Sequence, residues 1–323
     1  MTISATYTDL GDGVIHMDAE YLNPGVASVY LIIDGQECAI IETGTCHTIP
    51  YIMDVLEKYG LSEDNVRYVI PTHVHLDHAG GVGGLMEHCP NASLVIHPLG
   101  ARHMVDPSKL SAGAMAVYGE EAFNRLYGVL KPVEASRVIE APDLMELTLG
   151  ERTLRFYDTP GHAKHHFCVH DLSSNSIFSG DTFGISYPSL KTASNLPFIF
   201  ATTTPVQFDP DAMYNSIEKL MAAQPTAFNL THYGRVIPTP ELVTQLKDSI
   251  GAYLKIAAQA QNESSETRCT TMNDAITCYL LGAYQAMGGT ESEAIVREVI
   301  AMDSKLNAQG LDFWLSKQSK AVS

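Results

Sequence analysis

Three histidines and one aspartate lie within six residues of the chain, and their side chains are of the types that bind metal ions. Residues 72–81 read THVHLDHAGG. Imidazole and carboxylate groups suit Zn²⁺ and Fe²⁺. If this segment stays extended, His73 and His75 point the same way, because side chains alternate along a strand. Asp77 and His78, which follow a bend, then face a second position nearby, so the segment predicts a metal site.

Three further short motifs follow segments with the composition of strands. They read TPGH at 159–162, SGDT at 179–182 and THYG at 231–234. With the first motif, and in this order, they resemble the signature of the metallo-β-lactamase-fold hydrolase superfamily. The resemblance covers about residues 10–235. It implies an α+β fold, an αββα sandwich with its metals at one edge of two packed sheets.

The resemblance also implies a complete set of ligands for two divalent metal ions, Zn or Fe, with Mn as a further alternative. One ion would be held by His73, His75 and His162, the second by Asp77, His78 and His232, with Asp181 bridging the two. Two such ions lower the pKa of a bridging water, so that hydroxide exists near neutral pH, and they polarise a substrate oxygen. Asp77 and Asp181 are therefore the predicted catalytic carboxylates. Asp77 would also orient the water or pass a proton to the leaving group.

Several residues near these motifs have less certain roles. Glu42 stands where relatives commonly have Asp before Thr-Gly, and we expect its longer side chain to keep the hydrogen bond behind the ligands. Tyr187 and Tyr233 are candidates for binding substrate, with structural packing as the alternative. We interpret His166 as a packing residue beside the ligands.

Composition limits the classes of partner. The chain has 323 residues, with 20 Lys and Arg against 37 Asp and Glu, a formal charge of −17. Such a chain repels a phosphate backbone, so we expect no nucleic-acid partner. No apolar run reaches the roughly 18 to 20 residues of a membrane helix, so we expect no membrane association. Residues 1–20 are polar and acidic, unlike a secretory signal, which predicts a cytoplasmic location.

Periodicity and turn residues predict a mixed core followed by helices. Strand-like segments are 28–33, 37–41, 66–70, 93–96, 152–157, 166–170, 176–178 and 226–230. Helical segments are 48–59, 80–88, 211–223, 240–261 and 291–315. We therefore predict a catalytic domain over residues 1–240 and a helical extension over 241–323. The extension would cap the site or form a homodimer interface.

Two segments are too rich in apolar and aromatic residues for plain connections. Residues 104–130 and 182–208 are candidate walls of the active site, with helical packing and a surface loop as the respective alternatives.

The function implied is that of the glyoxalase II-like branch of these hydrolases, and of bacterial members with a helical C-terminal extension. The substrate would be a small molecule with an ester-like bond, either thioester, ester or lactone, attacked by a metal-bridging hydroxide. Three alternatives stay open. They are a mononuclear iron enzyme of the persulfide-dioxygenase type, a small-nucleotide phosphodiesterase, and a metal-bound sensor without catalytic activity.

Overall fold

The computed structural model describes residues 4–203 and 206–322, and the chain divides into two compact units. Unit 1 comprises Met1–Asp158, His165–Gly180 and Thr231–Gly234, and unit 2 comprises Thr159–Lys164, Asp181–Leu230 and Arg235–Ser323. These units are compact parts of the structure, whereas the boundary predicted at residue 240 separates two domains along the chain. That boundary stays a prediction.

Unit 1 contains a seven-stranded sheet in the order β1-β2-β3-β4-β5-β6-β7. Its strands are β1 (Tyr7–Asp9), β2 (Val14–Asp18), β3 (Ser28–Asp34), β4 (Glu37–Ile41), β5 (Val66–Ile70), β6 (Ser93–Ile96) and β7 (Val138–Glu140). The first four strands pair antiparallel and the last four pair parallel. The turn sequence Asp34-Gly35 predicts a hairpin between the strand-like segments 28–33 and 37–41, and this hairpin is confirmed, because Asp34 pairs with Glu37 across Gly35, which has φ +58°.

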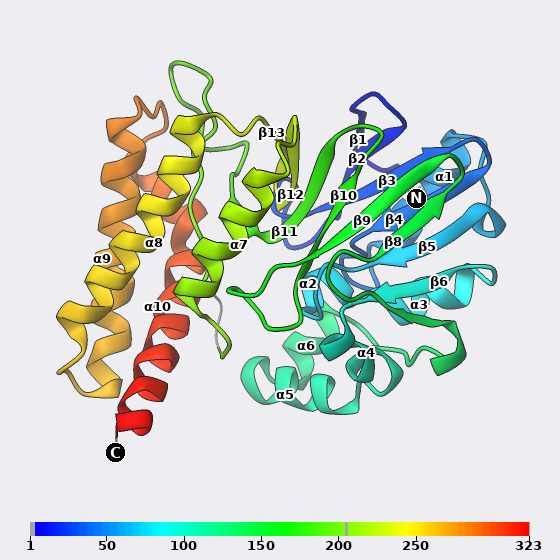
Figure 1. The fold of residues 1–323 in the computed structure, drawn as a ribbon. Coiled ribbons are helices and arrows are strands. Elements are labelled where there is room, and N and C mark those ends of the chain that lie inside the picture. The colour runs from blue at the N-terminus through cyan, green and yellow to red at the C-terminus, as the bar shows by residue number, and fades with distance from the viewer. Residues whose placement is uncertain (1–3, 204–205, 323) are drawn as a thin grey trace. The chain divides into compact units, whose positions relative to one another are not determined.

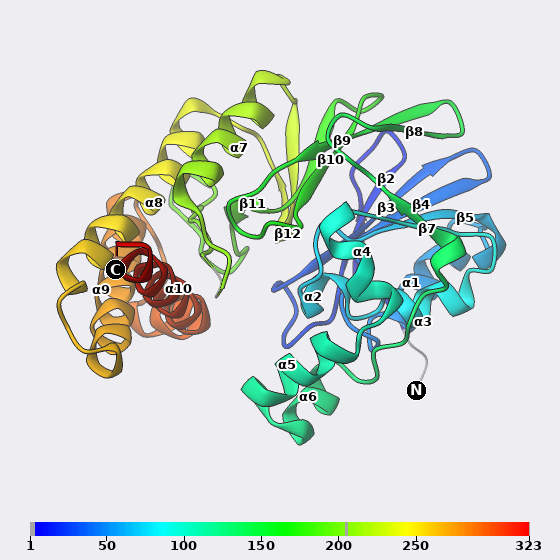
Figure 2. The same cartoon turned by 60° about the horizontal axis from the view of Figure 1, so that its bottom comes forward.

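Alternating side chains of this sheet enter two different cores. Val29 and Leu31 of β3 pack in the core beneath helices α1 (Ile49–Lys58), α3 (Val82–His88) and α4 (Pro98–Val105). Their neighbours Tyr30 and Ile32 pack on the opposite face. Figure 2 shows α1 and α3 on one side of these strands. Successive side chains of a strand point to opposite faces, and in these strands both sets are apolar. Both faces of the sheet are therefore buried.

The opposite face packs against a second sheet. Its strands in unit 1 are β8 (Glu146–Leu149), β9 (Arg152–Asp158), β10 (Phe167–Asp171) and the first half of β11 (Ser176–Ile185). Phe156, Phe167 and Phe178 of this sheet share one buried core with Tyr30 of the first sheet. Two sheets packed face to face, with helices outside the first, confirm the α+β sandwich.

The second sheet continues in unit 2. Among the described strands its order is β13-β12-β11-β10-β9-β8, with β12 at Ala227–His232 and β13 at Gly234–Val236. The rings of Phe183 on β11 and Phe228 on β12 are stacked. The sequence offers Asp209 and Asp211 as alternative caps for helix α7 (Pro210–Ala222), and the structure has Asp209, whose carboxylate accepts a hydrogen bond from Ala212 N at 3.0 Å.

Three long helices complete unit 2 and confirm the predicted helical C-terminal region. They are α8 (Pro240–Ala260), α9 (Ser265–Ala286) and α10 (Glu293–Val322), which lie side by side in Figure 1. Each buries apolar side chains spaced three or four residues apart, for example Leu246, Ile250 and Tyr253 on α8. Within the described residues, no helix combines the length and apolar character needed to cross a membrane.

The two apolar segments expected as loops are both more ordered than a surface connection. Residues 104–130 are mostly helical, in the end of α4, α5 (Ser108–Tyr118) and α6 (Glu120–Leu126), as the alternative of helical packing requires. Residues 186–203 are irregular and include exposed positions such as Leu196, but Phe198 and Phe200 are buried. Whether either segment forms a wall of the active site stays a prediction. The short α2 (Leu76–Ala79) and the 3-10 turns Glu63–Asn65 and Ala135–Arg137 complete the elements described.

Candidate metal centre

Asp77, His78 and His232 form a compact group in unit 1, here called the Asp77 cluster. Asp77 and His78 lie on α2, and His232 is the last residue of β12. One candidate ligand atom from each residue lies within 4.8 Å of the others. Asp77 Oδ2 is 3.7 Å from His78 Nε2 and 3.4 Å from His232 Nε2. The His78 side chain is fully buried, whereas that of Asp77 is 25% exposed, so solvent reaches the cluster at Asp77.

Hydrogen bonds behind the two rings fix which nitrogen faces Asp77. His232 Nδ1 donates to the carbonyl of Val26 at 2.8 Å, and His78 Nδ1 donates to Glu42 Oε1 at 2.9 Å. In a neutral ring, Nε2 is then left as the acceptor. Two nitrogen lone pairs and a carboxylate oxygen converging on one point repel one another unless a cation lies between them. The donor set therefore fits a divalent metal ion.

The Glu42 carboxylate is buried and joins two of the motifs, residues 72–81 and 231–234. It is 1% exposed. Besides His78, it accepts hydrogen bonds from Thr72 N at 3.1 Å, Thr72 Oγ1 at 2.6 Å and Thr231 Oγ1 at 2.8 Å. Glu42 has φ +66°, in the left-handed region that side-chain-bearing residues seldom adopt. The expectation that Glu42 keeps the hydrogen bond behind the ligands is confirmed.

Thr72 and Thr231 were not among the predicted site residues. Each directly precedes a candidate ligand, His73 or His232, and each donates its hydroxyl hydrogen to Glu42. The repeated dipeptide Thr-His was the signal in the sequence that could have identified them.

His73 and His75 face one another, as an extended segment requires. His73 Nε2 lies 2.7 Å from His75 Nδ1, and the ring centroids are 4.3 Å apart. His75 itself has extended backbone angles, φ −63° and ψ 148°. The buried ring of His166 lies 4.9 Å from that of His73, which agrees with its interpretation as a packing residue. The ring of His165 lies 5.8 Å from that of His75.

His162 and Asp181 form a second group, here called the His162–Asp181 pair, which belongs to unit 2. His162 Nε2 is 3.2 Å from Asp181 Oδ2, and His162 Nδ1 donates to the carbonyl of Thr202 at 3.4 Å. Both side chains are buried. The pair thus repeats the arrangement of the Asp77 cluster, with Nδ1 held from behind and Nε2 directed at a carboxylate.

The chain packs tightly beside this pair at Gly161. Gly161 has φ +138°, and a Cβ there would overlap the backbone of Met213 on α7. Asp209, the cap of α7, donates its N–H to the carbonyl of Gly161 at 2.8 Å. Glycine before His162 is therefore required by the close approach of α7.

The seven predicted ligands are divided between the two units. His73, His75, Asp77, His78 and His232 belong to unit 1, and His162 and Asp181 belong to unit 2. Their convergence on two shared ions stays a prediction.

The two tyrosines expected to bind substrate each donate to a carboxylate. Tyr233 OH lies 3.2 Å from Asp18 Oδ2 in unit 1, and burial together with the charge of Asp18 raises the pKa of Tyr233. Tyr187 OH lies 3.2 Å from Asp303 Oδ1 in unit 2. A phenol with a raised pKa keeps its proton at neutral pH, so Tyr233 is suited to donating a hydrogen bond. Contact with substrate stays a prediction for both.

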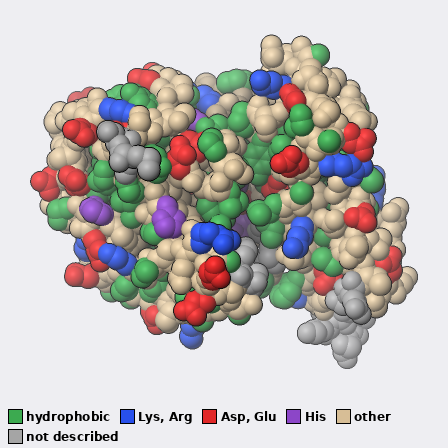
Figure 3. All heavy atoms as spheres, turned by 180° about the vertical axis from the view of Figure 1, so that it is seen from behind, with side chains coloured by type: hydrophobic (Ala, Val, Ile, Leu, Met, Phe, Trp, Pro, Cys, Tyr) green, Lys and Arg blue, Asp and Glu red, His purple; other side chains and the backbone are tan. Residues whose placement is uncertain are grey.

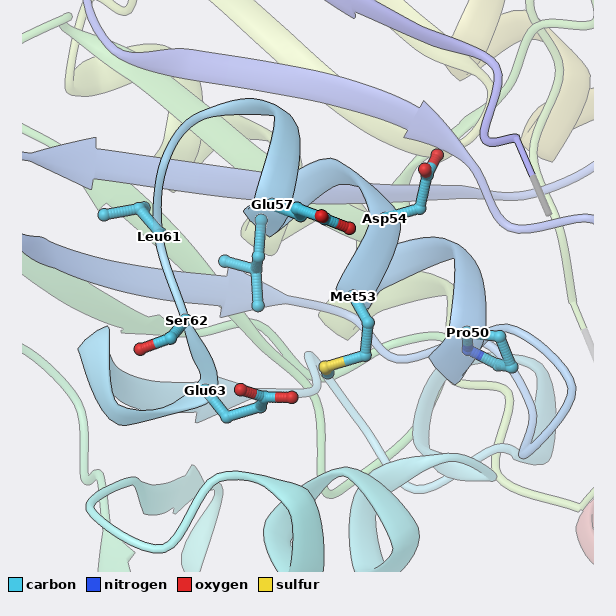
Figure 4. Close-up of a pocket in the computed structure, with 8 residues that line it drawn as sticks. Pro50, Met53, Asp54, Glu57, Leu61, Ser62 and Glu63 are labelled. Atoms are coloured by element: carbon cyan, nitrogen blue, oxygen red, sulfur yellow. The ribbon is translucent and has the colours of Figure 1, made fainter. Parts of the chain in front are cut away.

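A hollow of about 490 Å³ on the surface of α1 contains none of the predicted ligands. Asp54 and Glu57 of α1 and Glu63 of the following turn line it, with Met53 and Leu61, as Figure 4 shows. On the face drawn in Figure 3, Lys and Arg side chains lie among Asp and Glu side chains rather than in one continuous basic patch. The expected absence of a nucleic-acid partner is not tested by this one face.

Comparison with known proteins identifies the class. The sequence model of the metallo-beta-lactamase superfamily matches residues 22–226. The chain therefore belongs to this superfamily, as the four motifs predicted, and it is a metal-dependent hydrolase by class.

The relatives of the chain include two thioesterases. The chain is 26% identical over 219 residues to the metallo-beta-lactamase fold-containing protein ST1585 of Sulfurisphaera tokodaii, covering 67% of this chain and 76% of that protein. It is 25% identical to the acyl-coenzyme A thioesterase MBLAC2 of Gallus gallus, over 53% of this chain and 63% of that enzyme. It is 28% identical to the thioesterase pkgB of Emericella nidulans, over 54% of this chain and 42% of that enzyme. The matches thus span less than two thirds of either thioesterase.

Structural comparison agrees on the fold. The solved structure of ST1585 matches with a TM-score of 0.60 at 20% identity, covering 93% of this chain and 98% of that one.

Proposed function

We propose that this protein is a binuclear metal-dependent hydrolase that cleaves the thioester bond of a small molecule. The observation that carries this proposal is the Asp77 cluster, in which two imidazoles with anchored Nδ1 atoms direct Nε2 at one carboxylate. Zn or Fe, with Mn as an alternative, is the proposed metal, because imidazole and carboxylate ligands accept all three.

Short stretches of chain support the convergence of the two ligand groups. Asp181 directly follows Gly180, where a Cβ would overlap Thr72 Oγ1 and the ring of His166. Thr72 in turn precedes His73. Because consecutive Cα atoms are about 3.8 Å apart, Asp181 begins close to the ligands of unit 1. This connection supports Asp181 as the bridging ligand.

The position of His162 in the chain gives similar support. His162 precedes His165 by three residues, and the ring of His165 lies beside that of His75. This short connection supports His162 as the third ligand of the ion held by His73 and His75.

The chemistry then divides between the metals and the chain. Bound divalent ions supply hydroxide near neutral pH and polarise the carbonyl oxygen of the substrate. Asp77, at 25% side-chain exposure, is placed to orient the attacking water and to pass a proton to the leaving thiol. Glu42 holds His78 and the backbone before His73, so that the ligands need not reorganise during turnover.

The thioester is preferred to an ester, a lactone or a phosphodiester because two named relatives are thioesterases. A small molecule, rather than a nucleic acid, also suits a chain of charge −17.

A substrate panel on protein loaded with Zn²⁺, Mn²⁺ or Fe²⁺ tests the proposal. We expect acyl-coenzyme A or S-lactoylglutathione to exceed p-nitrophenyl esters, lactones and bis-p-nitrophenyl phosphate by more than tenfold in kcat/KM. Fastest cleavage of the phosphate diester would show that the substrate class is wrong. No turnover in any class with two ions bound would favour a sensor. One iron per chain with sulfur oxidation would favour a dioxygenase.

Removing the proposed bridge tests the mechanism. Asp181→Ala is expected to abolish turnover and to lower the metal content below two ions per chain, because both sites lose a ligand. The matched control is Asp211→Ala, an exposed carboxylate in the first turn of α7. Full activity in Asp181→Ala would overturn the bridging role.

A further inference from the structure

We propose that Asn307 on α10 is a positioning residue for the metal ligand His162. It would act by fixing the peptide carbonyl that receives the His162 hydrogen bond. The inference rests on the proposed function only in taking His162 as a ligand. All the contacts that carry it lie within unit 2.

The Asn307 side chain holds the backbone on both sides of Thr202. Asn307 is fully buried. Its Oδ1 accepts a hydrogen bond from Thr203 N at 2.6 Å, and its Nδ2 donates to the carbonyl of Ala201 at 3.3 Å. A carboxamide offers an acceptor and a donor at once, so one side chain satisfies the peptide groups that precede and follow Thr202. The backbone is therefore held on both sides of Thr202 by hydrogen bonds to Asn307.

Further contacts make this attachment rigid. Thr203 Oγ1 donates to the backbone carbonyl of Asn307 at 3.0 Å, so the hydrogen bonding is reciprocal. One turn later on α10, a Cβ at Gly310 would overlap the carbonyl of Thr203, which shows how closely the helix approaches. From α8, Ser249 Oγ accepts a hydrogen bond from Ala201 N at 2.9 Å. The segment 201–203 is thus held by two helices of the C-terminal region.

The held segment presents one carbonyl to the ligand. Thr202 O accepts the Nδ1 hydrogen of His162 at 3.4 Å, and His162 Nε2 faces Asp181 Oδ2 at 3.2 Å. A backbone carbonyl can only accept, so it selects the tautomer in which Nε2 is available to a metal. Groups behind metal-binding histidines of this kind typically change metal affinity by 10- to 100-fold when lost. Asn307 thereby links the helical extension to the ligand without touching a metal.

The test compares Asn307→Ala with Leu311→Ala in the full-length chain. Leu311 is also fully buried on α10 but is apolar, so its truncation loosens the helix without removing the carboxamide. We expect Asn307→Ala to bind one of two Zn²⁺ equivalents more weakly, but by less than the roughly 10- to 100-fold lost with a group that contacts the histidine directly, measured by competition with a chromophoric chelator. Leu311→Ala should lose thermal stability and keep both affinities. Equal affinities in wild type and Asn307→Ala, or equal weakening in both variants, would overturn the positioning role.

A second readout needs no metal. In the metal-free chain, ¹H–¹⁵N spectra should show His162 protonated at Nδ1 in wild type and in Leu311→Ala, and a mixture of tautomers in Asn307→Ala. An unchanged tautomer in Asn307→Ala would overturn the inference. If Asn307→Ala does not fold, Asn307→Asp replaces it, because it keeps the acceptor for Thr203 N and loses the donor to Ala201. If His162→Ala binds both Zn²⁺ ions as tightly as the wild type does, His162 is not a ligand. This result separates a failure of the proposed metal site from a failure of the positioning role of Asn307.

Discussion

His78 in unit 1 and His162 in unit 2 face carboxylates in the same way but are anchored differently. The Nδ1 of His78 donates to the buried carboxylate of Glu42, whereas the Nδ1 of His162 donates to the neutral carbonyl of Thr202. The carboxylate also accepts hydrogen bonds from Thr72 and Thr231, so one charged group holds residues of two motifs, 72–81 and 231–234. The carbonyl carries no charge, and the groups on either side of it, Thr203 N and the Ala201 carbonyl, are held by the Asn307 amide on α10.

This difference separates two ways of orienting a ligand. A buried carboxylate makes a ring more electron-rich and partly offsets the charge of a bound cation, but it costs free energy when no cation is present. A peptide carbonyl fixes the tautomer without adding charge. We therefore expect the two anchors to differ when metal is removed and when they are mutated.

Metal removal should produce the largest effect. Turnover is expected to cease, and Tm to fall by several degrees, because ions that bind the folded state at 100 times their Kd stabilise it by about 2.7 kcal/mol. Thermal unfolding before and after chelation measures this, and readdition of Zn²⁺ is the control. If Tm does not change, the Asp77 cluster and the His162–Asp181 pair are not metal sites.

Asp77→Asn should reduce kcat by about 10²- to 10⁴-fold, because the amide cannot take up or pass a proton. Steady-state kinetics with the best thioester measure the effect. Asp248→Asn, at an exposed position of α8, is the control. An unchanged kcat would show that Asp77 transfers no proton in the rate-limiting step. Of the predicted catalytic carboxylates, only Asp181 would then remain.

Glu42→Gln should weaken metal binding by about 10- to 100-fold. The amide removes the negative charge and directs a donor group at a site where four donors converge. Chelator competition measures the affinity, with Glu298→Gln, exposed on α10, as the control. If Glu42→Gln weakens metal binding no more than Asn307→Ala does, the negative charge of Glu42 contributes nothing to metal affinity beyond orienting the ligand.

Tyr233→Phe and Tyr187→Phe should have the smallest effects. Each loses one hydrogen bond to a carboxylate, Asp18 or Asp303, so we expect a loss of about 1 to 2 kcal/mol in the free energy of unfolding. Denaturant unfolding measures it. If kcat/KM falls more than tenfold in only one of the two variants, the tyrosine replaced in that variant contacts the substrate.

Local spacing predicts only the candidate ligands within residues 73–78, whereas His162, Asp181 and His232 were implied by the resemblance to the superfamily. Alternation along an extended segment is enough to direct His73 and His75 the same way, and Asp34-Gly35 is enough to place a hairpin. The superfamily and the helical C-terminal region followed from motif order and from helical periodicity. These features depend on residues close together in the chain.

Glu42 was expected behind the ligands from its position before Thr-Gly, but most of its partners and the contacts of Asn307 could not be predicted, because they join residues far apart in the sequence. Glu42 meets Thr231 across 189 positions, and Asn307 meets Thr203 across 104. No periodicity signals such a pair before the fold is known. Whether residues 104–130 are helical could not be decided for a different reason. Their mixed apolar and polar composition suits either a loop or a short amphipathic helix.

The uneven exposure of the Asp77 cluster has a practical consequence. Asp77 is 25% exposed, His232 9% and His78 not at all, so water and small chelators reach the group from the aspartate side. An ion held there exchanges with its surroundings through the oxygen ligand first, while the imidazoles stay covered. We therefore expect the metal in a purified sample to depend on the growth medium and buffers as well as on the preference of the protein, so reconstitution from the metal-free form is the way to measure that preference.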